Sequence, residues 1–289
     1  MRTAIDSATG TAGKLLTDGV ARLRLAGCTV SPELDAELLL AAALRIPRAH
    51  LRSHPEQRPD AAAASRFAGL IERRASGEPV AYLLGRKGFW SFELAVGPAV
   101  LVPRPETELL VERALSLRPE PHGRIADLGT GSGAVALALA LERPGWQVVA
   151  TDLSPEALAL ARANADALGC TRVAFAQGSW CAALPPGSFD LLVSNPPYIA
   201  ADDPALDALH SEPRLALTPG ADAMACLRAI IGAAPAHLAP GGWLVLEHGA
   251  GQGRAVAGEL AARGFVTVRT HRDLAGHERT TEGQWPAIR

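Results

Sequence analysis

From about Glu106 onward the chain alternates short apolar runs with amphipathic stretches, and this alternation limits the possible folds more than any other feature. The apolar runs have the length of buried strands, and the stretches between them have helical spacing. Strands are predicted at residues 124–128, 147–151, 173–176, 189–194 and 243–247, with helices that begin near Gly133, Ser154, Asp222 and Gln252. Such alternation predicts a mostly parallel sheet with helices on both faces. Two last runs, 265–270 and 279–285, predict an antiparallel hairpin that brings the sheet to seven strands.

The first 77 residues have a helical pattern and form the first predicted domain. Apolar side chains recur at helical spacing before Gly27, at Leu15, Leu16, Val20 and Leu23. A second helix is expected to begin at Pro32 after the N-cap Ser31 and to end at Leu44, and a third to span 60–74. Residues 45–74 hold seven arginines against three acidic residues. That excess is more typical of a solvated helix face than of a surface that docks a partner.

Residues 78–105 differ in composition from the helical region before them, with glycine, proline, aromatic and β-branched residues close together. The runs 89–96 and 99–102 flank Gly97 and Pro98, which predicts a β-hairpin linker with its turn at this pair. The second large domain is then expected to span 106–289.

Composition excludes several classes of protein. The chain carries 28 Lys and Arg against 30 Asp and Glu, so its net charge of −2 offers no general attraction to nucleic acid or anionic lipid. The longest uncharged apolar stretch, 229–246, is interrupted by glycines and prolines and does not predict a membrane helix. No secretory signal is recognised after Met1, and the four scattered cysteines fit reduced thiols better than a disulfide framework or a zinc site. We therefore expect a cytoplasmic protein without a metal site.

A glycine-rich loop follows the first strand of the predicted sheet and carries the strongest local signal. It consists of Gly129, Thr130, Gly131, Ser132 and Gly133. Without Cβ atoms the backbone can approach a ligand closely, and the following helix offers unpaired N–H groups. Asp152 closes the second strand, where an acidic residue can bind both hydroxyls of a ribose. A nucleoside-containing ligand is therefore expected at this edge of the sheet.

The spacing of the glycines separates two kinds of ligand. Dinucleotide-binding and S-adenosylmethionine-binding domains share this layout, but the loop lacks the G-x-G-x-x-G spacing of the dinucleotide fingerprint. Asp127, two residues before the first glycine, and the C-terminal hairpin also favour S-adenosylmethionine.

The sequence Asn195-Pro196-Pro197-Tyr198 follows the apolar run 189–194 directly and suggests the substrate. Two prolines stiffen the chain at the carboxyl end of a central strand, where open α/β sheets bind ligands. Asn195 brings a side-chain carbonyl, Pro196 a backbone carbonyl without a competing N–H, and Tyr198 a flat ring. Two acceptors and a ring suit a planar NH2 group. Its delocalised lone pair attacks a methyl donor poorly, and acceptors stabilise the nitrogen as it becomes positive.

These residues resemble the amino-methylating S-adenosylmethionine transferases, and more of the chain resembles the HemK-type release-factor glutamine methyltransferases. The further motifs are Gly77-Glu78-Pro79, Phe89-Trp90, Val102-Pro103-Arg104-Pro105-Glu106-Thr107-Glu108, Glu212-Pro213-Arg214-Leu215-Ala216-Leu217, Leu246-Glu247-His248-Gly249 and Asp273-Leu274-Ala275-Gly276-His277-Glu278-Arg279. The resemblance implies a class I methyltransferase: a Rossmann-like seven-stranded sheet with a small N-terminal helical bundle and a hairpin linker.

The resemblance also implies an activity and a role for each motif. The activity is methylation of the side-chain N5 of glutamine in the Gly-Gly-Gln motif of bacterial class-I peptide chain release factors, a step connected with translation termination. The glycine loop would hold the methionine part of the cofactor, Asp152 its ribose and Trp180 a face of its adenine. The four residues from Asn195 to Tyr198 would hold the glutamine, and Asn195 would also approach the cofactor. Arg104, Glu106 and Thr107 would border the cofactor, and Ser179 stands where the family commonly has an acid.

Several readings compete with these assignments. Trp180 is also compatible with simple packing against the sheet, and His248 is read as a hydrogen-bonded residue at a strand end rather than as a base or metal ligand. An adenine-N6 nucleic-acid methyltransferase would use the same Asn-Pro-Pro-Tyr motif, but residues 1–77 are a small surface for gripping phosphates. A non-catalytic ribosome-associated module is a third reading. We expect a monomer whose helical domain docks the release factor.

Overall fold

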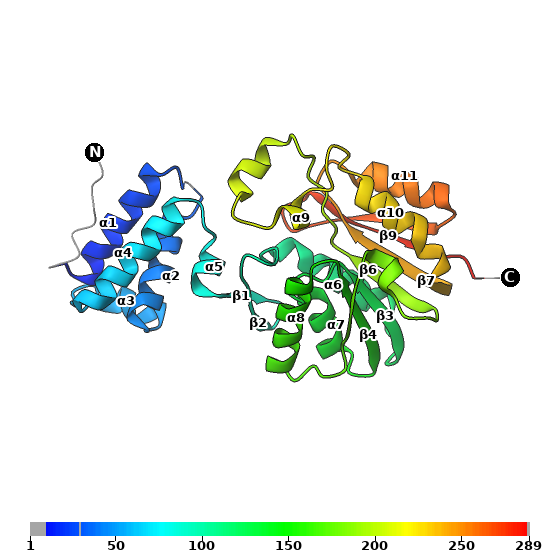
Figure 1. The fold of residues 1–289 in the computed structure, drawn as a ribbon, viewed down its shortest axis with the longest axis horizontal. Coiled ribbons are helices and arrows are strands. Elements are labelled where there is room, and N and C mark those ends of the chain that lie inside the picture. The colour runs from blue at the N-terminus through cyan, green and yellow to red at the C-terminus, as the bar shows by residue number, and fades with distance from the viewer. Residues whose placement is uncertain (1–9, 29, 288–289) are drawn as a thin grey trace. The chain divides into compact units, whose positions relative to one another are not determined.

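The computed structural model describes residues 10–28 and 30–287, and the chain divides into two compact units between Gly85 and Arg86 (Figure 1). The segment after Met1 that was examined for a secretory signal lies outside the described residues. None of the helices in the described part of the chain is long and apolar enough to cross a bilayer.

The first unit is a bundle of short helices around an apolar core. Its helices are α1 (Ala12–Leu25), α2 (Pro32–Leu44), α3 (Arg48–Ser53), α4 (Ala61–Ala75) and α5 (Val80–Leu84). The three helices that the sequence predicts are present. Pro32 is the first residue of α2, but the Ser31 hydroxyl binds the Asp35 carboxylate rather than a backbone N–H. Leu15, Leu39 and Phe67 are buried in the core.

The second unit begins with a two-stranded antiparallel hairpin whose turn differs from the prediction. Strands β1 (Arg86–Phe89) and β2 (Phe92–Ala95) pair around Trp90, not around Gly97 and Pro98. Trp90 adopts a φ of 54°, and its backbone N–H donates to the Glu108 carboxylate at 2.8 Å, so a side chain from outside the hairpin holds this tight turn. The predicted run 99–102 pairs with no strand among the described residues.

The main sheet has the predicted seven strands in the order β5-β4-β3-β6-β7-β9-β8. The strands are β3 (Gly123–Leu128), β4 (Trp146–Asp152), β5 (Ala174–Gln177), β6 (Phe189–Ser194), β7 (Leu238–Glu247), β8 (Val266–Arg272) and β9 (Glu278–Gln284). Strands β3 to β7 are parallel to one another, and β9 is antiparallel to both β7 and β8. The predicted parallel sheet with a terminal antiparallel hairpin is confirmed.

Helices cover both faces of this sheet, as Figure 1 shows. The helices are α6 (Glu108–Leu117), α7 (Ala134–Glu142) and α8 (Pro155–Ala167) on one face, and α10 (Ala225–Ala233) and α11 (Gly253–Arg263) on the other. Side chains alternate along each strand, so Leu128, Leu192 and Leu246 pack with α10 and α11 in one buried cluster. Helices α6 and α9 (Arg214–Leu217) were not predicted.

The pairing register brings the carboxyl ends of four strands level. Leu128 pairs with both Thr151 and Ser194, and Ser194 pairs with Leu246. The residues that follow this row are therefore neighbours at one edge of the sheet, although they lie far apart in the sequence.

The close packing around Gly19 in α1 leads to a testable prediction about the helical unit. A Cβ at this position would lie 2.8 Å from Cζ of the buried Phe67, so Gly19→Ala should destabilise the unit by about 1 kcal/mol or more despite its better helix propensity. Gly69 in α4 is the matched control, because its Cβ would meet no atom within 4 Å. Gly69→Ala should stabilise the unit by about 0.5 to 1 kcal/mol. Hydrogen exchange of the α1 and α4 amides, followed by mass spectrometry, measures both effects, and equal exchange in the two variants would contradict the packing argument.

Candidate functional site

A cavity of about 570 Å³ opens at the carboxyl ends of β3, β4 and β6. It lies entirely within the second unit. Most of the predicted site residues line it: Gly129, Thr130, Gly131, Ser132, Asp152, Trp180, Asn195 and Pro197. Gly133, Pro196 and Tyr198 are adjacent in sequence to lining residues but do not line the cavity themselves. The structure therefore brings the glycine loop, the acid and the Asn-Pro-Pro-Tyr segment to one place.

The glycine loop is held by backbone hydrogen bonds to the end of β4. The N–H groups of Gly129 and Thr130 both donate to the carbonyl of Thr151, at 2.9 and 2.8 Å. Gly129 and Gly131 have φ values of 78° and 56°, a left-handed conformation that favours glycine. A Cβ on Gly129 would also lie 2.9 Å from the Trp180 ring. The loop thus needs glycine both for its turn and for the approach of this ring.

Asp152 anchors the loop with its carboxylate. One oxygen accepts from the N–H of Gly131 at 2.8 Å and the other from the N–H of Ser154 at 2.9 Å. Each carboxylate oxygen can accept more than one hydrogen bond, so two backbone contacts leave capacity for a ligand. The side chain lines the cavity in a fixed orientation.

Asp127 is a second carboxylate next to the loop and is 2% exposed. Burial raises the pKa of Asp127 to about 7, although hydrogen bonds from the Thr130 hydroxyl and the Ala136 N–H act in the opposite direction. The nearby charge of Asp152 raises this pKa further. Asp127 therefore supports the loop through its contacts with Thr130 and Ala136, and it is also one of the residues that line the cavity.

The sequence left open whether Trp180 packs against the sheet or borders the ligand site, and in the structure it has both positions. It begins the short 3-10 helix η2 (Trp180–Ala183) with a φ of 46°, packs partly against the core cluster and lines the cavity beside Ser179. Its ring is thus both a packing element and one wall of the cavity.

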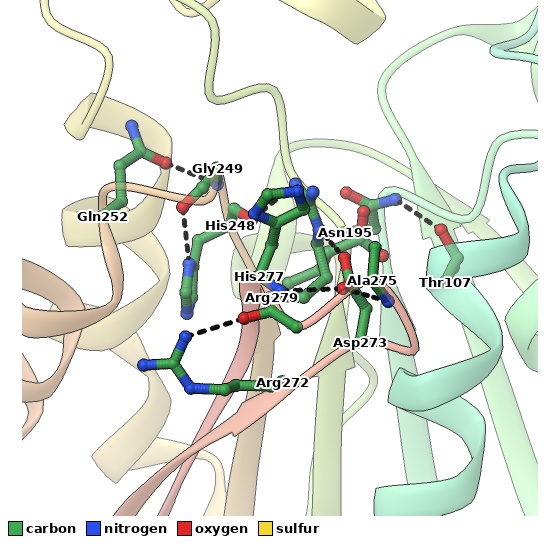
Figure 2. Close-up of polar contacts among 12 residues, drawn as sticks. Thr107, Asn195, His248, Gly249, Gln252, Arg272, Asp273, Ala275, His277 and Arg279 are labelled. Atoms are coloured by element: carbon green, nitrogen blue, oxygen red, sulfur yellow. Dashed lines mark hydrogen bonds and ion pairs between the residues drawn. The ribbon is translucent and has the colours of Figure 1, made fainter.

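The Asn-Pro-Pro-Tyr segment leaves the sheet at the end of β6 and is fixed at both ends. The Ser194 hydroxyl donates to the carbonyl of Leu128 at 2.6 Å, which joins the ends of β6 and β3. Asn195 Nδ2 donates to Thr107 Oγ1 at 3.1 Å, as Figure 2 shows. At the other end, the Tyr198 hydroxyl donates to Glu247 Oε1 at 3.3 Å. The Tyr198 carbonyl accepts from Gln252 Nε2 at 3.1 Å.

The contact between Asn195 and Thr107 decides which atom of the carboxamide is free. Because Nδ2 is engaged by the threonine, Oδ1 is the atom of this side chain without a hydrogen bond to the described residues. The Asn195 side chain therefore offers an acceptor at the cavity wall.

A contact that the sequence did not predict joins two loops beside the cavity. Glu212 is 6% exposed, and its carboxylate accepts from the N–H of Val102 and forms an ion pair with Arg104. These residues lie about a hundred positions apart in the chain, and residues next to both ends of the contact line the cavity. Of the three residues expected to border the cofactor, Arg104 and Thr107 line the cavity and Glu106 does not.

His248 has the structural role that was expected of it. It is fully buried, and its Nδ1 and Nε2 lie 2.9 Å from the Gly249 carbonyl and 2.8 Å from Thr281 Oγ1. Burial lowers the pKa of His248, which favours the neutral ring. No group of three or more His, Cys, Asp or Glu side chains suited to a metal ion occurs among the described residues.

The raised pKa of Asp127 predicts a pH-dependent stability difference. Between about pH 4 and 7 the unfolded chain carries this carboxyl ionised while the folded chain keeps it protonated, so the wild type loses stability as the pH rises. The Asp127→Asn variant lacks the ionisable carboxyl group and therefore this pH dependence. Its unfolding free energy relative to wild type should increase by roughly 1.4 kcal/mol per pH unit in that window. Urea unfolding at several pH values measures the difference, and a constant difference would disprove the buried, protonated state.

Comparison with known proteins identifies the family. Residues 14–85 match the PrmC N-terminal domain model, and residues 105–262 match the methyltransferase small domain model. The chain is 52% identical over 258 residues to a release factor glutamine methyltransferase of Xylella fastidiosa (strain Temecula1), a match that covers 88% of this chain and 94% of that protein. It is 51% identical over 257 residues to a release factor glutamine methyltransferase of Pseudomonas aeruginosa, covering 88% and 93%.

A solved structure supports the fold independently. A methyltransferase from Pyrococcus furiosus superposes with a TM-score of 0.53 at 18% identity, covering 77% of this chain and all of that one. At this identity the likeness concerns the fold alone. Because the sequence matches span most of the chain at about 50% identity, the chain belongs to the release factor glutamine methyltransferase family.

Proposed function

We propose that this protein transfers a methyl group from S-adenosylmethionine to the side-chain N5 of the glutamine in the Gly-Gly-Gln motif of bacterial class-I peptide chain release factors. One observation carries the proposal beyond family membership. The Asn195 side chain lines the same cavity as the glycine loop and Asp152, and its free atom is the carboxamide oxygen. An acceptor at this place suits a substrate that presents an NH2 group.

The residues around the cavity fit S-adenosylmethionine. The open backbone of Gly129 and Gly131 suits the methionine part, the anchored Asp152 carboxylate suits the ribose hydroxyls, and the Trp180 ring offers a flat wall for adenine. Ser179 brings a hydroxyl rather than a carboxylate beside that wall. When bound, S-adenosylmethionine supplies a methyl group on a positively charged sulfur.

The chain's own residues then orient and stabilise the amide nitrogen. Asn195 Oδ1 and the Pro196 carbonyl each accept one N–H of the substrate amide, which turns the nitrogen lone pair toward the methyl group. The amide nitrogen would become positive on accepting the methyl group, and the hydrogen bonds to Asn195 and Pro196 would then strengthen. The methylated amide cation is strongly acidic and releases its proton to water, so the site needs no dedicated base. Tyr198, held by Glu247, borders the glutamine side chain.

The partner assignments are part of the same proposal. We assign substrate docking to the helical region, 1–77 in the sequence-based division, with 78–105 as linker and 106–289 as the catalytic domain. Arg48 and Arg52 both pair with Glu37, and Arg74 pairs with Asp35, so much of the basic excess is already neutralised within the unit. This argues for a protein partner rather than phosphates. A monomer that works in the cytoplasm, without direct contact to nucleic acid or membrane, completes the proposal.

Mass spectrometry of the Gly-Gly-Gln peptide tests the activity directly. Purified release factor incubated with the protein and S-adenosylmethionine should gain a single methyl group on the glutamine. Duplex DNA is the parallel substrate, with tritiated methyl as the label. Label in DNA and none in the release factor would establish the adenine-N6 activity instead.

Asn195→Ala tests the acceptor role. The variant should lose methyl transfer by a factor on the order of 100 or more, because a hydrogen bond that strengthens in the transition state is removed. Its affinity for S-adenosylmethionine, measured by calorimetry, should change little. Unchanged turnover would refute the role assigned to the carboxamide oxygen.

Asp152→Ala tests the ribose assignment. Loss of hydrogen bonds to a charged group should weaken cofactor binding by roughly tenfold to a hundredfold. Calorimetry gives the affinity, and the thermal unfolding midpoint reports whether the glycine loop has collapsed. An affinity equal to that of wild type would remove Asp152 from the cofactor site.

A further inference from the structure

Glu247 is a buried carboxyl group whose position links the two ends of the Asn-Pro-Pro-Tyr segment. It is the last residue of β7 and is 1% exposed. Its Oε1 accepts from the Tyr198 hydroxyl at 3.3 Å, and the Thr107 hydroxyl is close enough to lower the pKa of the carboxyl. Oε2 is buried and has no partner of its own at hydrogen-bonding geometry among the described residues. An acceptor is thus available to the proton of Thr107.

The direction of these hydrogen bonds follows from the chemistry of the three groups. An ionised carboxylate can only accept, so a hydroxyl that meets it must donate. Once the Thr107 proton points at Glu247, the Thr107 oxygen can only accept from its other neighbour. That neighbour is Asn195, which must then present Nδ2 to the threonine, as is observed at 3.1 Å. The carboxamide oxygen is left facing the cavity.

Protonation of the carboxyl would remove this constraint. A protonated Glu247 can itself donate a hydrogen bond to Thr107, and the Thr107 proton is then free to turn toward Asn195. A rotated carboxamide, with Oδ1 on the threonine and Nδ2 toward the cavity, becomes compatible with the same packing. In that orientation Asn195 repels the NH2 group of a substrate amide.

We infer that Glu247 is a positioning residue that, when ionised, acts through Thr107 to fix the Asn195 carboxamide with its oxygen toward the substrate amide. The inference deepens the proposed function and rests on it for its catalytic consequence. The hydrogen-bond chain itself is a property of the protein alone.

The charged groups around Glu247 place its titration within an accessible range. Burial raises the pKa of Glu247 to about 7. Thr107, the positive charge of Arg279 and the Tyr198 hydroxyl lower it, while the charge of Glu106 raises it. Arg279 is held in place by Asp273 at 3.3 Å, within the turn drawn in Figure 2. Because the ionised form is the active one, turnover should fall as the pH drops through about 7.

Two readouts on the full-length protein test the inference. The first is the pH dependence of kcat with purified release factor, for wild type and Glu247→Gln. Wild-type kcat should fall by up to about tenfold per pH unit below the titration. The variant should lose about tenfold or more at pH 8 and show no fall across that range, with little change in the KM for S-adenosylmethionine. Thr107→Ser, which keeps the hydroxyl, should retain more turnover than Thr107→Val.

The second readout needs no substrate. In ¹⁵N-labelled protein the side-chain NH2 signals of Asn195, assigned by their loss in Asn195→Asp, should shift with a midpoint near pH 7. They should not shift in Glu247→Gln. The matched control is Glu282→Gln, because Glu282 is equally buried but lies on β9, where it pairs with Arg113. This control should keep the wild-type pH profile and the wild-type titration.

The outcomes separate the two proposals. A Glu247→Gln enzyme with the wild-type pH profile, or Asn195 signals that do not titrate in wild type, would overturn the positioning role even if release factor is methylated. Asn195 signals that titrate through Glu247 without any methylation of release factor would uphold the positioning role and overturn the proposed function.

Discussion

The site depends on one row of paired residues in the parallel sheet. Leu128, Thr151, Ser194 and Leu246 lie side by side on β3, β4, β6 and β7. The next residue on each strand is Gly129, Asp152, Asn195 and Glu247. Strand pairing therefore places a glycine, a partly buried carboxylate, a side-chain carboxamide and a buried carboxyl group along one edge. A shift in the register of any one strand would move its residue out of this row, because the pairing of the strands sets which residues are level.

Three acidic residues near the cavity, Asp127, Asp152 and Glu247, differ in burial and in their hydrogen-bond partners. Both Asp127 and Asp152 line the cavity, but Asp127 is 2% exposed and its pKa is raised to about 7, whereas Asp152 is only partly buried and accepts from two backbone N–H groups. Glu247 is buried beside Tyr198, in the segment that follows β6. Asp152 is only partly buried and can contact a ligand directly. The two buried acids each accept from a hydroxyl group, Asp127 from Thr130 and Glu247 from Tyr198.

Most of the fold could be predicted because periodicity is a local property. The seven strands, the helices after the glycine loop and after Asp152, and the terminal hairpin were all predicted, although β7 begins at Leu238, five residues before its predicted start. The position predicted for the turn of the linker hairpin was wrong. Gly97 and Pro98 are stronger turn residues than Trp90, but the left-handed Trp90 is held by Glu108 and Glu142 from α6 and α7. These contacts come from elsewhere in the chain, so no local pattern around the hairpin could reveal them.

The sequence by itself determined which residues end the strands: the glycine loop, Asp152 and the Asn-Pro-Pro-Tyr segment each follow an apolar run that can be recognised without any structure. Only the tertiary structure decided what these residues touch. Asn195 contacts Thr107, Tyr198 contacts Glu247 and Glu212 accepts from the Val102 N–H, although the two members of each pair come from separate parts of the chain. Strand order and register create these contacts. A linear pattern fixes where an acceptor stands along the chain, whereas the direction of its hydrogen bond depends on the neighbour that folding brings beside it.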